Sequence, residues 1–307
     1  MFLKVNNLSK LYNSENVIEN ITFSQKKGEI ISIIGSSGTG KTTVLNCLSG
    51  LVEVSSGTIF LNSARIDNVT ANLRNISYVF QESPLFPHMN VLENILFNLN
   101  IYEKKDLDSL IKKTSIDLIL NKYPHELSGG ENQRVAVVRS LIRKPDLLLL
   151  DEPFSNLDTP NKNILKEIIL NIIKKNQITT IMVNHDVKES LEISDRILVL
   201  NNCKIEAFDK PDSIYKFPKN LKIAKLFGEV TSFKLNNKVI YIRPENINIV
   251  NHSKYKIKVK KSYYIGGKYK IIGGYLKNNV TFFHKSNLSK GEVLFFNFNN
   301  DDILPIK

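Results

Sequence analysis

The stretch 35–43 reads Gly35-Ser36-Ser37-Gly38-Thr39-Gly40-Lys41-Thr42-Thr43 and matches the pattern G-x-x-x-x-G-K-[ST] at every fixed position. The run 29–34 before it is apolar and β-branched, which predicts a buried parallel strand. The run 44–50 after it predicts a helix that ends at a glycine. A glycine-rich turn before a helix is the alternative, but the full match and both flanks favour a phosphate-binding loop.

The residue types of this loop suit phosphate chemistry. Glycines let backbone N–H groups turn toward the β- and γ-phosphates of a nucleotide, and the following helix presents its positive end to them. Lys41 adds a mobile positive charge, and the Thr42 hydroxyl is a ligand for Mg²⁺. The loop is therefore predicted to hold nucleotide phosphates together with Mg²⁺.

Two carboxylates follow a second apolar run. Residues 147–150 are four leucines, which predict a buried strand, and Asp151 and Glu152 stand at its carboxyl end. Asp151 is placed to hold Mg²⁺ through water, opposite Thr42. The Glu152 side chain points elsewhere, toward the position from which water attacks the γ-phosphate. Paired acids at a strand end can merely cap a loop, but beside a phosphate loop we favour the catalytic role.

Gln81 and His185 also follow predicted strands, at 76–80 and 179–183. Side chains just past the carboxyl ends of parallel strands are placed to contact ligands. We expect the Gln81 amide to contact Mg²⁺ or the attacking water, and His185 to bond the γ-phosphate and orient that water. A simple strand-end hydrogen bond is the alternative for Gln81, and a lone histidine usually has no catalytic role.

A second anion site is predicted at the start of another helix, in the segment 127–134. Ser128 is typical of an N-cap, and Glu131 three residues later completes a capping box. Gly129 and Gly130 leave backbone N–H groups open at the positive end of this helix. A plain helix start does not require the glycine pair.

The remaining patterns add an antiparallel start and a helical insertion to the α/β core. Residues 2–5 and 17–23 predict two strands, with Tyr12 in the turn between them. Tyr12 is placed to stack on a purine, and packing is an equally good explanation. Residues 92–123 predict a small helical subdomain, and 211–227 predict a helix that closes the domain.

Composition limits the class of protein. The chain has 307 residues of which 42% are hydrophobic, enough for two domains with packed cores. Cys47 and Cys203 lie far apart and match no metal spacing, so we expect packing residues in a reducing compartment. No segment has about 18 consecutive apolar residues and the N-terminus lacks a signal-peptide pattern. We expect a soluble protein, or one held at a membrane by a partner.

The net charge of +12 is unevenly spread. Residues 229–307 contain 14 Lys and Arg but 5 Asp and Glu, whereas 1–228 contain 28 and 25. A basic tail is able to contact nucleic acid or an anionic membrane. We favour a solvated lysine face, because the lysines alternate along a predicted strand at Lys254, Lys256 and Lys258.

Together these motifs resemble those of the nucleotide-binding subunits of ATP-binding-cassette (ABC) transporters, over about residues 1–228. The matching segments look like Walker A (35–43), the Q-loop (Gln81), the signature (127–131), Walker B (147–152), the D-loop (155–158, with Asp158), the switch histidine (His185) and the adenine-stacking aromatic (Tyr12). The signature separates this family from other P-loop enzymes, such as kinases, GTPases and helicases.

The resemblance implies a P-loop α/β fold and a head-to-tail homodimer. Each ATP, with Mg²⁺, would lie between Walker A of one copy and Ser128, Gly129 and Gly130 of the other. Glu152-assisted hydrolysis would then let the copies part. The family usually has Gln where this chain has Glu131, so we expect that carboxylate to face away from the γ-phosphate.

The tail resembles the C-terminal OB-like (TOBE) domains of importer ATPases, through Arg243-Pro244-Glu245 within 242–247. We therefore expect an ABC ATPase domain at 1–228, with its helical subdomain at about 91–127, and a small all-β OB-like domain at 229–307. The helical insertion looks about ten residues shorter than usual for this group, and the tail also looks short.

This likeness implies an importer ATPase, peripheral to the cytoplasmic face of the inner membrane. Its partners would be membrane permease subunits and, indirectly, a periplasmic or lipid-anchored substrate-binding protein, with no nucleic acid. Ferric iron is the first candidate solute, slightly ahead of polyamine, sulfate, molybdate, phosphonate or sugar. The alternative is a non-transport cassette ATPase acting on nucleic acid or ribosomes, which the basic tail favours; an exporter ATPase would normally lack the OB-like tail.

Overall fold

The computed structural model describes residues 1–82, 84–99, 104–154, 159–235 and 238–306. The chain forms two compact units, Met1–Pro211 and Asp212–Lys307. No helix among the described residues is long and apolar enough to span a membrane. Each unit is described by itself.

A six-stranded sheet organises the first unit, in the order β10-β9-β3-β8-β7-β6. Its strands are β3 (Ile30–Ile34), β6 (Ile76–Val79), β7 (Leu147–Asp151), β8 (Thr179–Val183), β9 (Arg196–Asn201) and β10 (Lys204–Asp209). All neighbours are parallel except β9 and β10, which form an antiparallel hairpin. Every residue of β3, β7 and β8 is buried, because both faces of this sheet are covered.

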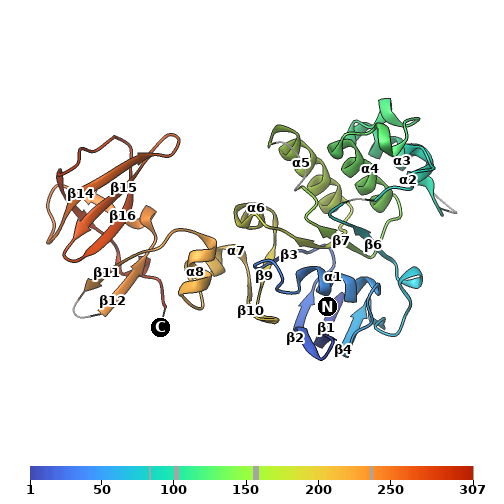
Figure 1. Ribbon diagram of the computed structural model, residues 1–307, viewed down its shortest axis with the longest axis horizontal. Helices are drawn as coiled ribbons and strands as arrows, with labels where there is room; N and C mark the ends of the chain where they lie inside the picture. The colour runs from blue at the N-terminus through green and yellow to red at the C-terminus, as the bar shows by residue number, and fades with distance from the viewer. Residues whose placement is uncertain (83, 100–103, 155–158, 236–237, 307) are drawn as a thin grey trace. The chain divides into compact units, whose positions relative to one another are not determined.

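An antiparallel sheet covers one face together with helix α1 (Lys41–Ser49). It runs β2-β1-β4-β5, formed by β1 (Leu3–Tyr12), β2 (Glu15–Gln25), β4 (Ser56–Leu61) and β5 (Ala64–Arg65). Its apolar side chains form one buried cluster with α1 and with β3, β7, β8 and β9. Helix α1 lies between the two sheets (Figure 1). The expected antiparallel start is confirmed, and Tyr12 is the last residue of β1 rather than a turn residue.

Helices cover the other face. These are α4 (Gly129–Leu141), α5 (Thr159–Lys175) and α6 (Val187–Ile193), and they share a buried cluster with β3, β7 and β8. The helical insertion consists of α2 (Val91–Leu96), α3 (Lys104–Thr114) and 3₁₀ turns at Asp117–Ile119 and Pro124–Glu126. Its apolar side chains form a separate cluster against α4, so this insertion has its own small core beside the sheet (Figure 1).

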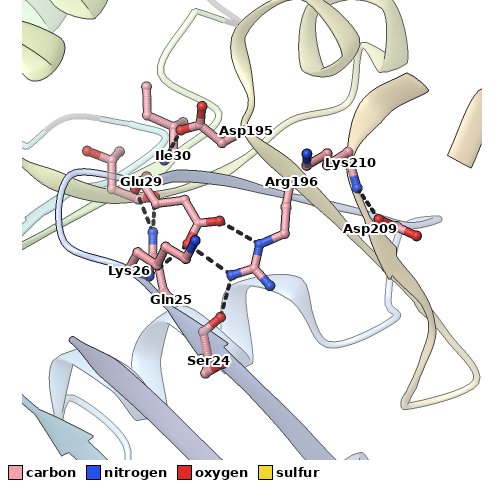
Figure 2. A network of polar contacts seen from close by, with 10 residues as sticks. Ser24, Gln25, Lys26, Glu29, Ile30, Asp195, Arg196, Asp209 and Lys210 are labelled. Atoms are coloured by element: carbon pink, nitrogen blue, oxygen red, sulfur yellow. Dashed lines mark hydrogen bonds and ion pairs between the residues drawn. The ribbon is translucent and has the colours of Figure 1, made fainter. Parts of the chain in front are cut away.

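Polar contacts fix the start of β3, as Figure 2 shows. The Arg196 guanidinium donates to both carboxylate oxygens of Glu29, at 2.5 and 2.9 Å, and to the Ser24 carbonyl at 2.5 Å. The Ile30 N–H donates to the Asp195 carboxylate at 2.8 Å. Arg196 also lies over the Phe208 ring, 4.2 Å from its centre. These contacts join β2, β3, β9 and β10 where the phosphate-loop strand begins.

The second unit begins with two short helices and continues as β structure. Its elements are α7 (Pro211–Lys216), α8 (Leu221–Phe227), β11 (Thr231–Leu235), β12 (Lys238–Ile242), β13 (Asn248–Val250), β14 (Tyr255–Tyr264), β15 (Tyr269–Tyr275), β16 (Asn278–His284) and β17 (Val293–Asn297), with 3₁₀ turns at Pro244–Asn246 and Asn300–Asp302. The single helix expected at 211–227 is wrong. Pro218 lies between the two helices and cannot donate a backbone hydrogen bond, and the Asn220 side chain caps α8.

The β strands enclose one apolar core, as expected for a small all-β domain. A five-stranded antiparallel sheet runs β13-β17-β14-β15-β16, and β11 and β12 form a hairpin. The aromatic side chains of Phe233, Tyr255, Phe282 and Phe296 are central to the cluster between them. Strands β11 to β17 all lie within 229–307, the range in which the sequence predicts an all-β domain.

A buried arginine gives the Arg-Pro-Glu segment a structural role within this unit. Arg243 is only 2% exposed and donates to the backbone carbonyls of Tyr215, Ala224 and Glu229 at 2.7 to 3.1 Å. Its guanidinium stacks over the Tyr215 ring, and the Tyr215 hydroxyl donates to Glu245. Burial raises the pKa of Tyr215 to about 12, with the Glu245 hydrogen bond as the next cause. The segment therefore joins α7 and α8 to the β core.

Candidate functional site

The glycine loop joins β3 to α1 with two residues in left-handed backbone conformations. Gly38 has φ of 79° and Gly40 has φ of 91°. A Cβ on Gly40 would stand 2.5 Å from the Ile18 side chain and 2.6 Å from the Val17 carbonyl, so only glycine fits there. A Cβ on Gly38 would meet nothing within 4 Å. Strand β2 thus packs against the end of the loop, while its tip is open.

Lys41 curls back over its own loop. Its ammonium group donates to the Gly35 carbonyl at 2.8 Å and to the Ser36 carbonyl at 3.0 Å. Burial lowers its pKa, and the charges of Glu152 and Asp151 oppose that shift. Lys41 therefore lies close enough to both carboxylates for their charges to act on it. The neighbouring Thr42 is exposed at the first turn of α1.

The strand order brings the other predicted groups to the same edge. Going outward from β3, the carboxyl ends of β8, β7 and β6 carry His185, then Asp151 and Glu152, then Gln81. The Gln81 amide donates to one carboxylate oxygen of Glu152 at 2.9 Å, and His185 Nε2 contacts the other. Three residues that are far apart in sequence thus form one contact group.

The Glu152 carboxylate is aimed by an unusual backbone. Its φ of 50° lies in the left-handed region, and its N–H donates to the Val183 carbonyl at 3.0 Å. Such a conformation costs a non-glycine residue on the order of 1 kcal/mol. The side chain is 11% exposed, whereas that of His185 is 54% exposed. The turn after β7 therefore holds an acidic group under strain beside the phosphate loop.

Sequence reasoning missed two residues that support this edge. The Tyr78 hydroxyl donates to the buried Asp151 carboxylate at 3.3 Å, and burial, then the charge of Asp151, raises the pKa of Tyr78. The buried Asn184 amide donates to Ser32 at 3.1 Å and Ser190 at 3.2 Å, which ties the end of β8 to β3. The sequence offered two signals for them: Tyr78 is a tyrosine inside a predicted strand, and Asn184 is a polar residue directly after one.

The second predicted anion site is a capped helix start. The Ser128 hydroxyl accepts from the Glu131 N–H at 3.3 Å, and the Glu131 carboxylate accepts from the Ser128 N–H at 2.8 Å and from its hydroxyl at 2.7 Å. The capping box is thus confirmed. Those bonds, the backbone one first, lower the pKa of Glu131. A Cβ on Gly129 would meet nothing within 4 Å, so this surface is open to an approaching molecule.

Two predicted groups, Tyr12 and the helix start at 128–130, stay apart from the contact group. Tyr12 is 45% exposed, with the Lys10 ammonium 5.0 Å from its ring centre. Among the described residues, neither Tyr12 nor 128–130 has a polar contact with the loop 35–43. Asp158 lies outside the described residues.

A family model and several known proteins match this chain. The family model described as ABC transporter matches residues 18–155. The Fe(3+) ions import ATP-binding protein FbpC 2 of Haemophilus influenzae is 39% identical over 237 residues, which is 74% of this chain and 67% of that protein. The chain belongs to the ATP-binding subunits of ABC importers. It is an ATPase of the ABC type.

Other importer ATPases match over a similar share of the chain. The sulfate/thiosulfate import ATP-binding protein CysA of Mannheimia succiniciproducens is 35% identical, covering 76% of this chain and 68% of that protein. The spermidine/putrescine import ATP-binding protein PotA of Aliivibrio fischeri is 37% identical, covering 75% of this chain and 64% of that protein. The importer resemblance is therefore confirmed, while the names of these relatives differ in solute.

Solved ABC structures share the fold of this ATP-binding subunit. A dimeric, post-hydrolysis structure of the ATP-binding cassette MJ0796 with ADP and Pi has a TM-score of 0.62 and 26% identity, covering 68% of this chain and 98% of that one. The structure of cbiO1 from Clostridium perfringens, described as part of the ABC transporter complex cbiONQ, has a TM-score of 0.63 and 29% identity, covering 70% of this chain and 90% of that one. The P-loop α/β fold expected from the sequence is confirmed.

Proposed function

We propose that this chain hydrolyses ATP to drive uptake of a small solute through a separate membrane permease. The observation that carries the proposal is the contact of Gln81 and His185 with the Glu152 carboxylate, which follows β7; only β8 lies between β7 and the phosphate-loop strand β3. That arrangement supports Glu152 as the base and Gln81 and His185 as groups that orient the attacking water.

Each nucleotide-site residue then has a distinct role. The backbone of residues 35–40 surrounds the phosphates, and Lys41 exchanges its bonds to Gly35 and Ser36 for phosphate oxygens. Glu152 takes the proton of the attacking water as the water oxygen bonds to the γ-phosphorus, and the bond from that phosphorus to the β–γ bridging oxygen breaks, so that ADP leaves. Gln81 and His185 orient that water, and Tyr12 stacks on the adenine, supported by its exposed ring.

The oxygen ligands available here suit Mg²⁺. Thr42 offers an exposed hydroxyl, Asp151 a carboxylate and Gln81 an amide oxygen, which are the hard donors this ion prefers. Asp151 would act through water, and its hydrogen bond from Tyr78 fixes its orientation. When bound, the ion neutralises charge that develops on the phosphate oxygens. Among the described residues, no group of three or more His, Cys, Asp or Glu is arranged to hold a metal ion by itself.

The open helix start at 128–130 is the second half of a site that needs a partner copy. Ser128 and Gly129 are exposed, and the N–H groups of α4 point outward from a helix N-terminus. A head-to-tail homodimer would place Ser128, Gly129 and Gly130 against the γ-phosphate held by the partner subunit. Asp158 would lie at the same seam.

The transport partners follow from the importer family. We infer a peripheral location on the cytoplasmic face of the inner membrane, permease subunits as direct partners and a substrate-binding protein as an indirect one. Ferric iron is the first candidate solute, supported by a relative named for Fe(3+) import at 39% identity. Polyamine and sulfate are the competing solutes, supported at 37% and 35%. The β unit at 229–307 is the accessory domain of this assembly.

A reconstituted complex tests this function. The chain would be purified with its permease, placed in liposomes and given a substrate-binding protein with Fe³⁺, spermidine, sulfate, molybdate or a phosphonate. We expect one solute to stimulate ATP hydrolysis and to accumulate inside, and a complex with Glu152→Gln to do neither. Salt-sensitive binding of DNA or RNA by the intact chain, with no uptake of any solute, would instead support a nucleic-acid function.

A further inference from the structure

A cavity of about 580 Å³ lies at the amino edge of the six-stranded sheet, where its parallel strands begin. Its walls come from α3, from the connection between α4 and β7, and from the end of α5 with the connection to β8. Phe2 and Lys27 complete it. The volume is in the range of small-molecule sites in proteins. None of the residues assigned to the nucleotide site lines it.

The floor of this α3–α5 cavity is apolar. Leu141, Ile142, Ile172 and Ile178 line it and are at least 93% buried, and Leu110 of α3 is half-buried beside them. Leu110 belongs to the helical insertion, whereas the other four belong to α4 and α5, the helices that cover the sheet, and to the connections that follow them. An apolar portion of a ligand would therefore gain contact with both.

The rim of the cavity carries excess positive charge. Lys144 is paired with Asp106 at 2.7 Å, and the Asp146 carboxylate accepts from the Asn75 amide at 3.1 Å. The other lysines of the lining are Lys27, Lys113 and Lys175, all exposed. Among the described residues these three form no ion pair, and Lys27 lies only over the Phe2 ring, 5.7 Å from its centre. In the described part of the lining, three lysines and one carboxylate, that of Asp146, are therefore left without an ion pair.

We propose that the α3–α5 cavity binds an amphipathic anion, with an acidic head on Lys113 and Lys175 and an apolar portion on the floor. Charge complementarity selects a phosphate, sulfonate or carboxylate head, because lysines act on such groups as point charges. The bound molecule connects α3 to the end of α5, and so holds the helical insertion against the sheet. This site is separate from ATP chemistry, and its test does not depend on hydrolysis.

The opposing explanation is that these lysines only compensate helix dipoles. Lys113 is in the last turn of α3 and Lys175 in the last turn of α5, where cations are favoured. The same explanation applies equally to their sequence neighbours Lys112 and Lys174, which occupy the same last turns but do not line the cavity. Substitution of Lys113 and Lys175, compared with substitution of Lys112 and Lys174, therefore distinguishes a ligand site from a helix-dipole effect.

The first experiment uses 1-anilinonaphthalene-8-sulfonate, which has an anionic head and an aromatic body, as a fluorescent probe of the full chain without nucleotide. We expect saturable binding to one site. The pair of substitutions Lys113→Glu and Lys175→Glu should weaken it about tenfold or more, because it reverses two charges at the head position. The matched pair Lys112→Glu and Lys174→Glu, with the same change of net charge, should leave the affinity within about twofold.

The second experiment asks which part of the ligand matters and where it binds. Octyl phosphate should displace the probe, and octanol at the same concentration should not. Hydrogen exchange of α3 should slow with octyl phosphate in the natural chain and in the Lys112 and Lys174 control. Equal probe affinity in both charge-reversed proteins, or equal displacement by octanol, would overturn the proposal; circular dichroism melting of both proteins shows that each is folded.

Discussion

At the amino edge of the six-stranded sheet Glu29 is paired with Arg196, and at the carboxyl edge Glu152 is contacted by Gln81 and His185. The first carboxylate meets a permanent cation in a two-point contact and joins four strands. The second meets an amide and an imidazole, on a backbone with φ of 50°. The Glu29 contact therefore makes the amino edge rigid, whereas the carboxyl edge holds Glu152 in a strained conformation, next to the groups that its proposed role as a base requires.

We expect the largest effect, a loss of ATP turnover, from a substitution at the carboxyl edge. Glu152→Gln keeps the shape of the side chain but removes the proton acceptor, so ATP turnover should fall at least about 100-fold. Binding of ATP should persist, because the loop 35–43 is untouched, and the dimer should accumulate in an ATP-bound form. Turnover is measured with purified chain, and the dimer by size-exclusion chromatography with ATP. Turnover at the natural rate would show that another group is the base.

The sequence was sufficient to predict which residues lie at the carboxyl edge of the sheet. It was not sufficient to predict the hydrogen bonds that hold them there. Apolar runs followed by polar residues marked the carboxyl ends of β3, β6, β7 and β8, and parallel strands bring such ends together. The order of the strands was not readable, since β8 is the partner of both β3 and β7 although it follows them in the chain. The bond from Tyr78 to Asp151 depends on that order.

Polar contacts between residues far apart in the sequence could not be predicted from it either. Glu29 and Arg196 are 167 residues apart, and neither has a local pattern that selects the other. Arg243 illustrates the same limit, because resemblance marked its motif but only the fold reveals its contacts with Tyr215, Ala224 and Glu229. The break between α7 and α8 is different, because the sequence contains a signal for it. Pro218 indicates a helix break, whereas the apolar pattern around it predicted one continuous helix.

An intermediate effect is expected at the amino edge. Arg196→Met keeps the stem against Phe208 but leaves Glu29, whose side chain is 10% exposed, without its cation. We expect a loss of about 2–3 kcal/mol in the free energy of unfolding of the first unit, less than for a fully buried pair. Calorimetry measures it, and ATP turnover per folded molecule should stay near the natural value.

The control for that loss is an exposed ion pair in the same sheet region. Lys204 and Glu19 are 3.0 Å apart with side chains 57% and 33% exposed. Lys204→Met should cost less than about 0.5 kcal/mol. If both substitutions destabilise the unit equally, the contrast between the two edges does not rest on the burial of the Arg196 contact.

The smallest expected effect concerns an acidic group whose partners are local rather than distant. Glu131→Gln retains a capping-box acceptor for the Ser128 N–H, so stability at pH 7 should change by less than about 0.5 kcal/mol. The hydrogen bonds from Ser128 lower the pKa of Glu131 in the folded chain. Their contribution is therefore complete above the ordinary glutamate pKa of about 4.3 and is lost as pH falls through the lower, folded value.

Urea unfolding of both proteins at pH 7 and at about pH 3.5 measures this difference, because all other titrating groups are shared. The natural chain should lose more stability on acidification than Glu131→Gln, by a few tenths of a kcal/mol, since the site is open to solvent. An identical loss in both would mean that the Glu131 carboxylate does not hold the start of α4 in solution. It would then be free to turn toward a partner's nucleotide, where its charge would oppose the γ-phosphate, and Glu131→Gln should tighten the ATP-bound dimer instead.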